Sequence, residues 1–188
     1  MDWIEKTFTE AEKILKDKES VFIGIDGRCA SGKTTFAARL QQRCGGNLIH
    51  MDDFFLRPEQ RTRERLESPG GNVDYERFLQ EVMEPLARKE KCLYRPYDCH
   101  RQEFKDAIYI EPERITIVEG SYSCHPALWE YYDLHVFLTI DSDLQMRRIS
   151  QRNKSNADDF RNKWIPMEEK YFTACGIQNK CEIVFGVS

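Results

Sequence analysis

One short stretch constrains the fold of this chain more than any other. Residues 27–34 read Gly-Arg-Cys-Ala-Ser-Gly-Lys-Thr, which satisfies the phosphate-binding pattern G-x-x-x-x-G-K-[ST]. Residues 21–26 before it form an apolar run typical of a buried strand, and residues 35–40 after it are typical of a helix. This strand–loop–helix order turns successive backbone N–H groups and the helix N-terminus toward a polyphosphate. The stretch therefore predicts a site for a nucleoside triphosphate.

Individual residues of this loop carry different parts of that chemistry. Lys33 would add a cationic charge at the β- and γ-phosphates, and Thr34 would offer its hydroxyl to Mg²⁺. An ordinary glycine-rich turn before a helix is the alternative, and the matching strand and helix disfavour it. We assign the nucleotide contacts to Gly27, Arg28, Cys29, Ala30, Ser31, Gly32, Lys33, Thr34 and Thr35.

The bulk properties narrow the choice of partners. A chain of 188 residues suits one domain with a sizeable core, and a net charge of −4 lacks the basic excess of nucleic-acid-binding proteins. No apolar run is long enough to span a bilayer, and the N-terminus has no signal-peptide pattern. The seven cysteines are scattered without C-x-x-C spacing, so we expect reduced thiols in a cytoplasmic protein. Cys29 lies in the loop, where a helix N-terminus could lower its pKa.

Two further acidic positions follow predicted strands. Residues 47–51 are typical of a second strand and lead into Asp52, where a carboxylate can accept a hydroxyl proton and orient that oxygen toward a γ-phosphate. A turn-forming or helix-capping aspartate is the structural alternative. The apolar residues 115–118 end at Glu119, a pattern typical of the acidic residue that reaches Mg²⁺ directly or through water.

The remaining pattern predicts a three-layer α/β fold of the P-loop NTPase type, with helices on both faces of a mostly parallel sheet. We expect one domain over residues 1–188, with a substrate-side loop and hairpin over about 56–110 and an arginine-bearing lid over about 146–162. Residues 57–72 are predicted to be a mobile loop, Pro166 to break or kink a helix, and Asp74 and either Asp141 or Ser142 to cap helices. The expected elements are helices at 2–18, 74–89, 126–132 and 158–174, and strands at 92–97, 107–110, 134–138 and 182–185.

Several of these motifs, taken together, resemble the uridine kinase-like branch of P-loop kinases, which includes uridine/cytidine kinases and nicotinamide riboside kinases. They fall in the family's order over most of the chain, and the D-x-F-[FY] element is the marker most specific to this branch. The matching segments are the loop at 27–34, Asp52-Asp53-Phe54-Phe55, Asn72-Val73-Asp74, Pro96-Tyr97-Asp98, Val118-Glu119-Gly120 and the arginine-bearing helix.

The resemblance implies roles for particular residues. Asp52 would be the general base, Asp74 would hold the ribose hydroxyls, and Tyr97 would lie near the nucleobase. The lid arginines would be Arg148 and Arg152, acting with Lys33 on the phosphates. We accordingly assign catalysis to Asp52, Lys33, Arg148 and Arg152, the substrate contacts to Asp52, Phe55, Asp74 and Tyr97, and the metal to Thr34 and Glu119.

The sequence also departs from the family pattern. The segment after Tyr97 is compressed, so His100 has no clear counterpart, and the spacing of the arginines leaves Arg147 open as an alternative to Arg148. Residues 164–172 look like a bacterial subgroup often labelled uridine kinase by similarity.

Three functional hypotheses follow. The leading one is an ATP- and Mg²⁺-dependent kinase for a nucleoside 5′-hydroxyl, with nicotinamide riboside, pantothenate or a sugar as alternative acceptors. A nucleotide-dependent switch is disfavoured, because residues 153–156 lack the aspartate of the N-K-x-D guanine motif. A non-catalytic relative is disfavoured by the complete set of Lys33, Thr34, Asp52 and Glu119. Base preference, the choice of ATP or GTP and the oligomeric state stay open.

Overall fold

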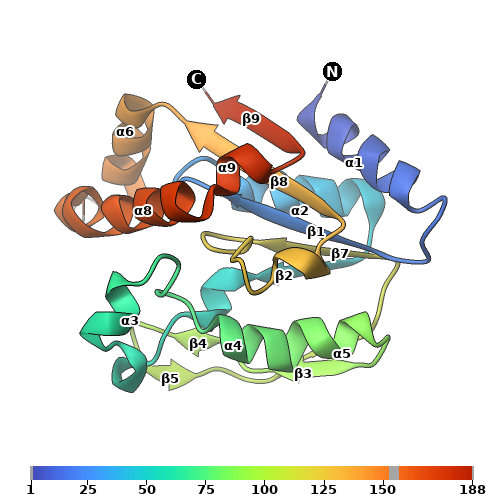
Figure 1. Cartoon of the computed structure of the whole chain (residues 1–188), viewed down its shortest axis with the longest axis horizontal. Coiled ribbons are helices and arrows are strands. Elements are labelled where there is room, and N and C mark those ends of the chain that lie inside the picture. The colour runs from blue at the N-terminus through green and yellow to red at the C-terminus, as the bar shows by residue number, and fades with distance from the viewer. Residues whose placement is uncertain (1, 153–156, 188) are drawn as a thin grey trace.

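The protein is organised around one parallel sheet (Figure 1). The computed structural model describes residues 2–152 and 157–187. Within those residues the main sheet has five strands in the order β2-β7-β1-β8-β9, and every neighbouring pair in it is parallel. Its strands are β1 (Val21–Gly27), β2 (Asn47–His50), β7 (Ile115–Glu119), β8 (Leu134–Ile140) and β9 (Ile183–Val187).

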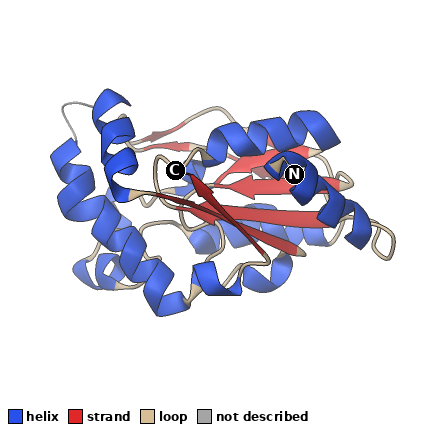
Figure 2. Ribbon diagram, turned by 90° about the horizontal axis from the view of Figure 1, so that it is seen from above, coloured by secondary structure: helices blue, strands red, loops and turns tan. Residues whose placement is uncertain are grey.

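Helices cover both faces of this sheet, which confirms the three-layer α/β architecture (Figure 2). The central strands β1 and β7 are buried along their whole length, because side chains of alternate residues enter two different cores. On one face, Ile23 and Ile25 pack with α1 (Trp3–Ile14) and α2 (Lys33–Cys44). On the other face, Phe22 and Phe137 pack with the helix that begins at Tyr75, with α8 (Ile165–Cys175) and with α9 (Ile177–Lys180).

Helix starts follow the capping residues of the sequence. The side chain of Asp74 accepts a hydrogen bond from the Arg77 N–H and caps the helix made of α4 (Tyr75–Phe78), a π-helical segment (Leu79–Met83) and α5 (Glu84–Ala87). Asp141, rather than Ser142, accepts from the first N–H groups of α6 (Ser142–Arg152).

Of the two predicted effects of Pro166, a break or a kink, the break is wrong. The chain stays helical through α7 (Ala157–Asp159), a π-helical segment (Phe160–Trp164) and α8. Pro166 is the second residue of α8, directly after the π-helical turn. Pro85 holds the same position in α5, after its own π-helical turn. A widened turn keeps the proline ring away from the carbonyl that it would otherwise strike, so both helices continue.

The substrate-side region forms the lower layer of Figure 1. It contains α3 (Arg63–Glu67) and two small antiparallel pairs, β3 (Cys92–Tyr94) with β6 (Ile108–Ile110), and β4 (Tyr97–Asp98) with β5 (Glu103–Phe104). The first pair is the predicted hairpin. The second was missed, because strands of two residues leave no periodicity to detect.

Residues 57–72, which we predicted to be a mobile loop, contain short helical elements. They contain a 3-10 turn (Pro58–Gln60) and α3, which Thr62 caps through the N–H of Arg65. Arg65 holds this segment in place by a two-point ion pair with Glu76 and a hydrogen bond to the Gly71 carbonyl. Charged residues form the internal contacts of this segment, so its polar composition did not indicate these helical elements.

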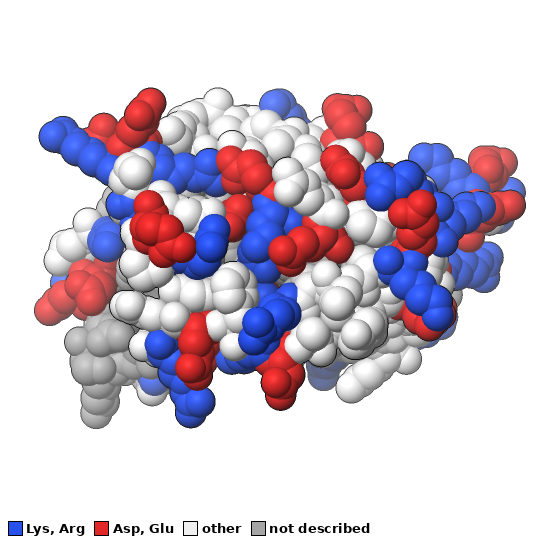
Figure 3. Space-filling view, turned by 90° about the horizontal axis from the view of Figure 1, so that it is seen from below, with Lys and Arg blue, Asp and Glu red and all other residues white. Residues whose placement is uncertain are grey.

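The surface carries both signs of charge. Seen from below, the described residues place Lys and Arg side chains among Asp and Glu side chains, and neither sign forms a continuous field on that face (Figure 3). Among the residues that the structure describes, no helix has the length and apolar character needed to cross a membrane.

Both ends of the described chain lie at the top of Figure 1. The ring of Trp3 in α1 stacks on that of Phe185 in β9, with centroids 4.8 Å apart and planes 8° from parallel. The Phe36 ring of α2 also packs on Phe185. A single aromatic cluster thus joins the first helix, the phosphate-loop helix and the last strand.

Candidate functional site

The candidate site begins at the carboxyl end of β1. After β1 the chain continues to β2 on one side of this strand, and after β7 it crosses to β8 on the other side. Ligands of open α/β sheets bind at such a point. The loop between β1 and α2 is packed on the neighbouring strand β8. A Cβ atom at Gly27 would lie 2.1 Å from the Leu138 carbonyl oxygen, and the φ of Gly27 is +136°, so only glycine fits. The Arg28 N–H donates to the same carbonyl. The first glycine of the motif therefore sets the close approach of loop and sheet.

Several polar groups of this loop remain available to a ligand. Gly32, with a φ of +98°, is the N-cap of α2 and brings no side chain to the first N–H groups of that helix. The Ser31 hydroxyl is buried and has no hydrogen-bond partner among the described residues. Lys33 is buried and donates to the carbonyls of Gly27 and Arg28, at 2.7 and 3.0 Å. A helix start without a side-chain cap, a buried hydroxyl without a partner and a buried lysine together suit an anion.

The two predicted metal-binding residues lie next to each other. The Thr34 hydroxyl is 3.2 and 3.3 Å from the two carboxylate oxygens of Glu119, which is buried at the end of β7. His50, at the end of β2, places its Nδ1 atom 2.6 Å from the same carboxylate, and this hydrogen bond raises the pKa of His50. A hydroxyl beside a carboxylate offers the hard oxygen donors that Mg²⁺ prefers, so these residues fit that ion.

Asp52 faces the same space from the 3-10 turn Met51–Phe54. Its side chain is open to solvent, yet the walls of the cavity and the Glu119 charge raise its pKa, while Lys33 opposes this shift. A 170 Å³ cavity brings most of the predicted catalytic groups together. It is lined by Cys29, Ala30, Gly32, Lys33, Thr34, Thr35, Asp52, Glu119, Gly120, Ser121 and Arg152.

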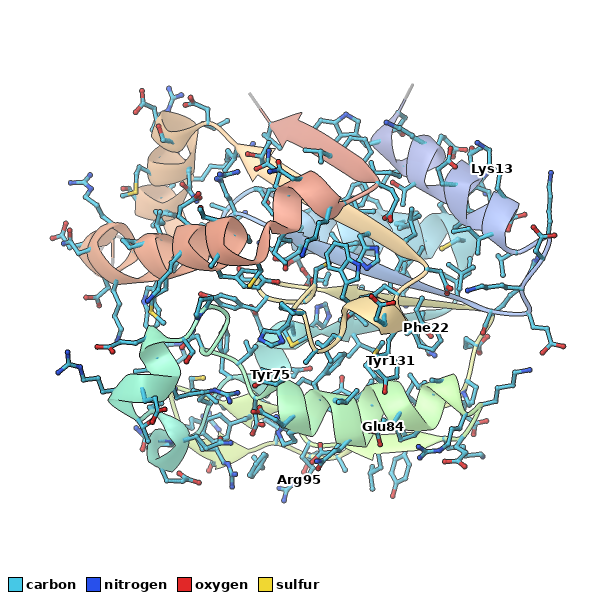
Figure 4. All side chains as sticks on the ribbon, viewed as in Figure 1. Lys13, Phe22, Tyr75, Glu84, Arg95 and Tyr131 are labelled. Carbon is cyan, nitrogen blue, oxygen red and sulfur yellow. The ribbon has the colours of Figure 1, made fainter. Side chains whose placement is uncertain are left out.

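Backbone contacts bring Asp74 beside this turn. The Asp74 N–H donates to the Phe54 carbonyl, and Phe55 forms an isolated bridge with Val73. The Asp74 carboxylate is buried, caps α4 and accepts a 2.7 Å hydrogen bond from Gln60. In Figure 4 the next residue, Tyr75, points from α4 toward the sheet layer, where its ring stacks on the His125 imidazole.

Tyr97 contributes a second unpartnered polar group. It lies in β4, which contacts the 3-10 turn that carries Asp52. Its ring packs edge-on against Phe104, and only 5% of the residue is exposed. Its hydroxyl has no hydrogen-bond partner in the described part of the chain. Arg95, at the outer edge of the lower layer in Figure 4, holds the β4–β5 pair by donating to the carbonyls of Phe104 and Lys105.

The arginines of α6 divide between two surfaces. Arg148 donates to the Ala30 carbonyl of the phosphate loop at 3.1 Å, and Arg152 lines the cavity described above. Arg147 instead lines a shallow depression on another side of α6, with Asp143 and Arg161. The geometry therefore favours Arg148 and Arg152 over Arg147. Residues 153–156, part of the predicted lid and of the region compared with N-K-x-D, lie outside the described residues.

A second cavity of 430 Å³ adjoins the first. Both cavities are lined by Gly32, Thr35 and Arg152, so the two meet at the phosphate loop. The second one extends to the first residues of α1 and the end of β8. Its wall consists of Asp2, Trp3, Ile4, Ser31, Gly32, Thr35, Phe36, Arg39, Leu138, Arg148, Arg152 and Val187.

The electrostatics of Cys29 differ from the sequence-based prediction. Burial and the nearby Glu168 carboxylate raise the pKa of the Cys29 thiol to about 12, so the expected lowering by the helix N-terminus is wrong. Gln145 of α6 donates from its side-chain amide to the Cys29 carbonyl at 3.0 Å. Cys29 is thus a neutral, half-buried group between the loop and α6.

Sequence reasoning missed several residues that shape the site. Asp26, which is fully buried, accepts hydrogen bonds from the backbone N–H groups of Gly27, Tyr122 and Cys124 and from the Tyr171 hydroxyl. Burial raises the pKa of Asp26 to about 6. The position of Asp26, directly before the first glycine of the phosphate loop, could have identified it from the sequence. No local pattern pointed to the other missed residues, which are His50, Gln145, Glu168 and Glu169.

Comparisons with known proteins identify a matching family model, related sequences and a related fold. The model of the phosphoribulokinase/uridine kinase family matches residues 22–157. A uridine kinase of Oceanobacillus iheyensis is 30% identical over 164 residues, which cover 75% of this chain and 73% of the relative. A uridine kinase of Clostridium perfringens is 28% identical over 141 residues, covering 70% of this chain and 67% of the relative.

A solved structure is similar over nearly the whole chain. It is described as a possible uridine kinase from Bacillus stearothermophilus and superposes with a TM-score of 0.71 at 21% identity. The match covers 98% of this chain and 100% of the other. At that identity the likeness concerns the fold.

Proposed function

This chain belongs to the phosphoribulokinase/uridine kinase family, and we propose that it transfers the γ-phosphate of ATP to a hydroxyl of a small molecule. The preferred acceptor is the 5′-hydroxyl of a nucleoside such as uridine. The observation that carries the proposal is the shared cavity, in which Lys33, the Thr34–Glu119 pair and Asp52 face one another at the end of the phosphate loop.

On the donor side, the phosphates would take the N–H groups at the start of α2 and the Ser31 hydroxyl. Lys33 would exchange its two carbonyl partners for phosphate oxygens. Thr34 and Glu119 would hold Mg²⁺, which supplies charge neutralisation at the transferring phosphate when it is bound. The adjoining 430 Å³ cavity leaves room for the nucleoside part of the donor.

On the acceptor side, Asp52 would accept the hydroxyl proton and orient that oxygen for in-line attack. Its raised pKa brings the carboxyl closer to neutral pH, which favours proton transfer. Asp74 would bind a vicinal diol, and the unpartnered Tyr97 hydroxyl and the Phe55 ring would contact the rest of the acceptor. A ribose presents such a diol, and for this reason a nucleoside ranks above pantothenate; a riboside such as nicotinamide riboside, or a sugar, remains the alternative acceptor.

Charge that develops during transfer would be stabilised by Lys33, Arg148 and Arg152. We place the two arginines in a lid over about residues 146–162 of one kinase domain that spans residues 1–188. The contact of Arg148 with the phosphate-loop carbonyl of Ala30 supports this role.

The test is a transfer assay with ATP, Mg²⁺ and a panel of nucleosides, sugars and pantothenate. Asp52→Asn should lower kcat by about 10²–10⁴-fold, because it removes the proton acceptor, and should leave ATP binding within about threefold. Asp53→Asn is the matched control, since it removes a neighbouring carboxylate that contacts the Tyr94 hydroxyl instead.

The outcomes separate the parts of the proposal. Transfer to a non-nucleoside alone would reject the nucleoside while keeping the kinase. Full activity of Asp52→Asn would reject the general base. Absence of any phosphoryl transfer, with slow ATP hydrolysis that responds to a protein partner, would favour a nucleotide-dependent switch.

A further inference from the structure

The helix α8 reaches the phosphate loop through a buried carboxylate. Glu168, only 5% exposed, accepts a hydrogen bond from the Cys29 N–H at 2.9 Å through one oxygen. Its other oxygen accepts from the Ser121 hydroxyl at 2.6 Å. One side chain therefore joins the loop after β1 to the loop after β7.

Neighbouring residues of the same helix reinforce this connection. Glu169 forms a two-point ion pair with the Arg28 guanidinium, at 2.6 and 2.9 Å. The Tyr171 hydroxyl donates to Asp26, whose carboxylate also accepts from backbone N–H groups of the loop after β7. Three residues within one turn of α8 thus hold the two loops from the same side.

Burial of the Glu168 carboxylate has an energetic cost. Burying a carboxylate loses its hydration, and two hydrogen bonds offset part of that loss. The loops that it joins adjoin the two halves of the candidate metal site. Thr34, in the first turn of α2, follows Cys29 by five residues, and Glu119, the last residue of β7, precedes Ser121 by two. The family model ends at residue 157, before α8 begins.

We propose that Glu168 is a positioning residue, which sets the spacing of the two loops so that Thr34 and Glu119 can bind one metal ion together with the nucleotide. This inference rests on the proposed nucleotide- and metal-binding site, but not on the identity of the acceptor. The carboxylate acts through its two hydrogen bonds to Cys29 and Ser121. In this role it would act without contacting the nucleotide or the metal.

Two substitutions separate the hydrogen bonds from the charge. Glu168→Ala removes both contacts. Glu168→Gln keeps them without the charge, because the amide oxygen can accept from the Cys29 N–H while the amide nitrogen donates to the Ser121 oxygen. Glu67→Ala is the matched control, since Glu67 is an exposed glutamate that pairs with Arg63 on the surface.

The measurement is the affinity for Mn²⁺ in the presence of ADP, followed by electron paramagnetic resonance, together with calorimetric binding of Mg²⁺·ADP. Neither readout needs an acceptor. Loss of two hydrogen bonds to a charged group predicts a roughly tenfold or greater weakening of both affinities in Glu168→Ala. Glu168→Gln should recover to within about threefold of the wild type, and Glu67→Ala should match it.

Ser121→Ala provides a second test if Glu168→Ala folds poorly, because it removes one of the two contacts and leaves Glu168 bound to Cys29. It should weaken Mn²⁺ binding about threefold to fivefold. Wild-type affinity in Glu168→Ala and Ser121→Ala would overturn the inference. Tighter binding in both Glu168 variants would also overturn it, since Glu168 would then compete with phosphate. Equal impairment of Gln and Ala would assign the effect to charge and not to position.

Failure of this inference is distinct from failure of the proposed function. If this inference fails, the wild type and Glu168→Ala bind Mg²⁺·ADP with equal affinity. If the proposed function fails, the wild type still binds the nucleotide but transfers no phosphoryl group to any acceptor.

Discussion

At the scale of single residues, Asp74 combines a structural and a proposed functional role. Its carboxylate caps α4 and accepts from Gln60, so replacing it could disturb both the helix and the acceptor site. Asn is as good an N-cap as Asp, whereas Ala is a poor one. The choice of substitution therefore decides which role is measured.

We expect Asp74→Asn to leave the free energy of unfolding and the ATP affinity nearly unchanged, while the KM for a riboside rises about tenfold as the charge on the diol is lost. Asp74→Ala should in addition lower the free energy of unfolding by about 1 kcal/mol. Urea unfolding and steady-state kinetics measure the two effects. An unchanged riboside KM in Asp74→Asn would remove this residue from the acceptor site.

His125 predicts a pH-dependent contribution to stability. Burial, followed by the Arg65 charge, lowers the pKa of His125 to about 4, and its Nδ1 atom accepts from the Ala127 N–H. The ordinary pKa of about 6.5 applies in the unfolded chain. The unfolded state thus binds the extra proton between pH 6.5 and 4, so stability is complete above that window and falls as the pH drops through it.

We expect the wild type to lose about 2–3 kcal/mol more free energy of unfolding between pH 7 and 4.5 than His125→Asn, which keeps an acceptor for Ala127 but does not titrate there. Urea titrations at both pH values measure the difference. Parallel pH profiles for the two proteins would show that His125 stays unperturbed.

At the scale of elements, the turn between α2 and β2 contains two glycines with different environments. A Cβ atom at Gly46 would lie 2.1 Å from the Ile115 carbonyl oxygen, whereas nothing lies within 4 Å of one at Gly45. Both have positive φ, +73° at Gly45 and +85° at Gly46. Backbone strain therefore affects both substitutions, and a clash with β7 affects only one.

We expect Gly45→Ala to cost about 1–3 kcal/mol of unfolding free energy, from backbone conformation alone. Gly46→Ala should cost clearly more, because β2 must move away from the Ile115 carbonyl. Chemical denaturation of both variants checks the order. Equal losses would mean that the β2–β7 edge adapts without penalty.

The elements also show what can be predicted from sequence and what cannot. The phosphate loop, Glu119 and the Asp74 cap were predicted because each depends on a short run of residues with its own local physics. The β4–β5 pair escaped because two residues define no period, and a break at Pro166 was wrongly predicted because the π-helical turn that accommodates the proline has no sequence signature. Glu168 escaped for another reason. Its partners lie 139 and 47 residues away, and nothing local marks a glutamate that will be buried.

At the scale of the whole molecule, the fold class could be predicted from the sequence, because buried parallel strands appear in it as apolar runs. The loop contacts could not be predicted, because they depend on distant parts of the chain. Helices on both faces follow from these apolar runs, because the side chains of β1, β7 and β8 need to be buried on both sides of the sheet. The grouping of Thr34 and Glu119 follows from strand order, since β7 lies beside β1.

Ligand binding should stabilise the whole molecule. At a free Mg²⁺·ATP concentration of about 100 times Kd, linkage adds about 2.7 kcal/mol, which for a chain of this size raises the Tm by about 5–10 °C. Lys33→Met should abolish most of this shift, because the phosphate charge loses its partner. Differential scanning fluorimetry measures both proteins, with adenosine as the control that lacks phosphates. An equal shift in Lys33→Met would place the nucleotide elsewhere.

The stacked rings of Trp3 and Phe185 bear on the order in which the protein is made. A ribosome synthesises α1 long before β9, yet each supplies the ring that stacks on the other. During synthesis the indole of Trp3 therefore lacks this stacking partner until about 180 more residues have followed it. Until β9 has been synthesised, that face of the indole is open to solvent and is a natural place for a chaperone to bind.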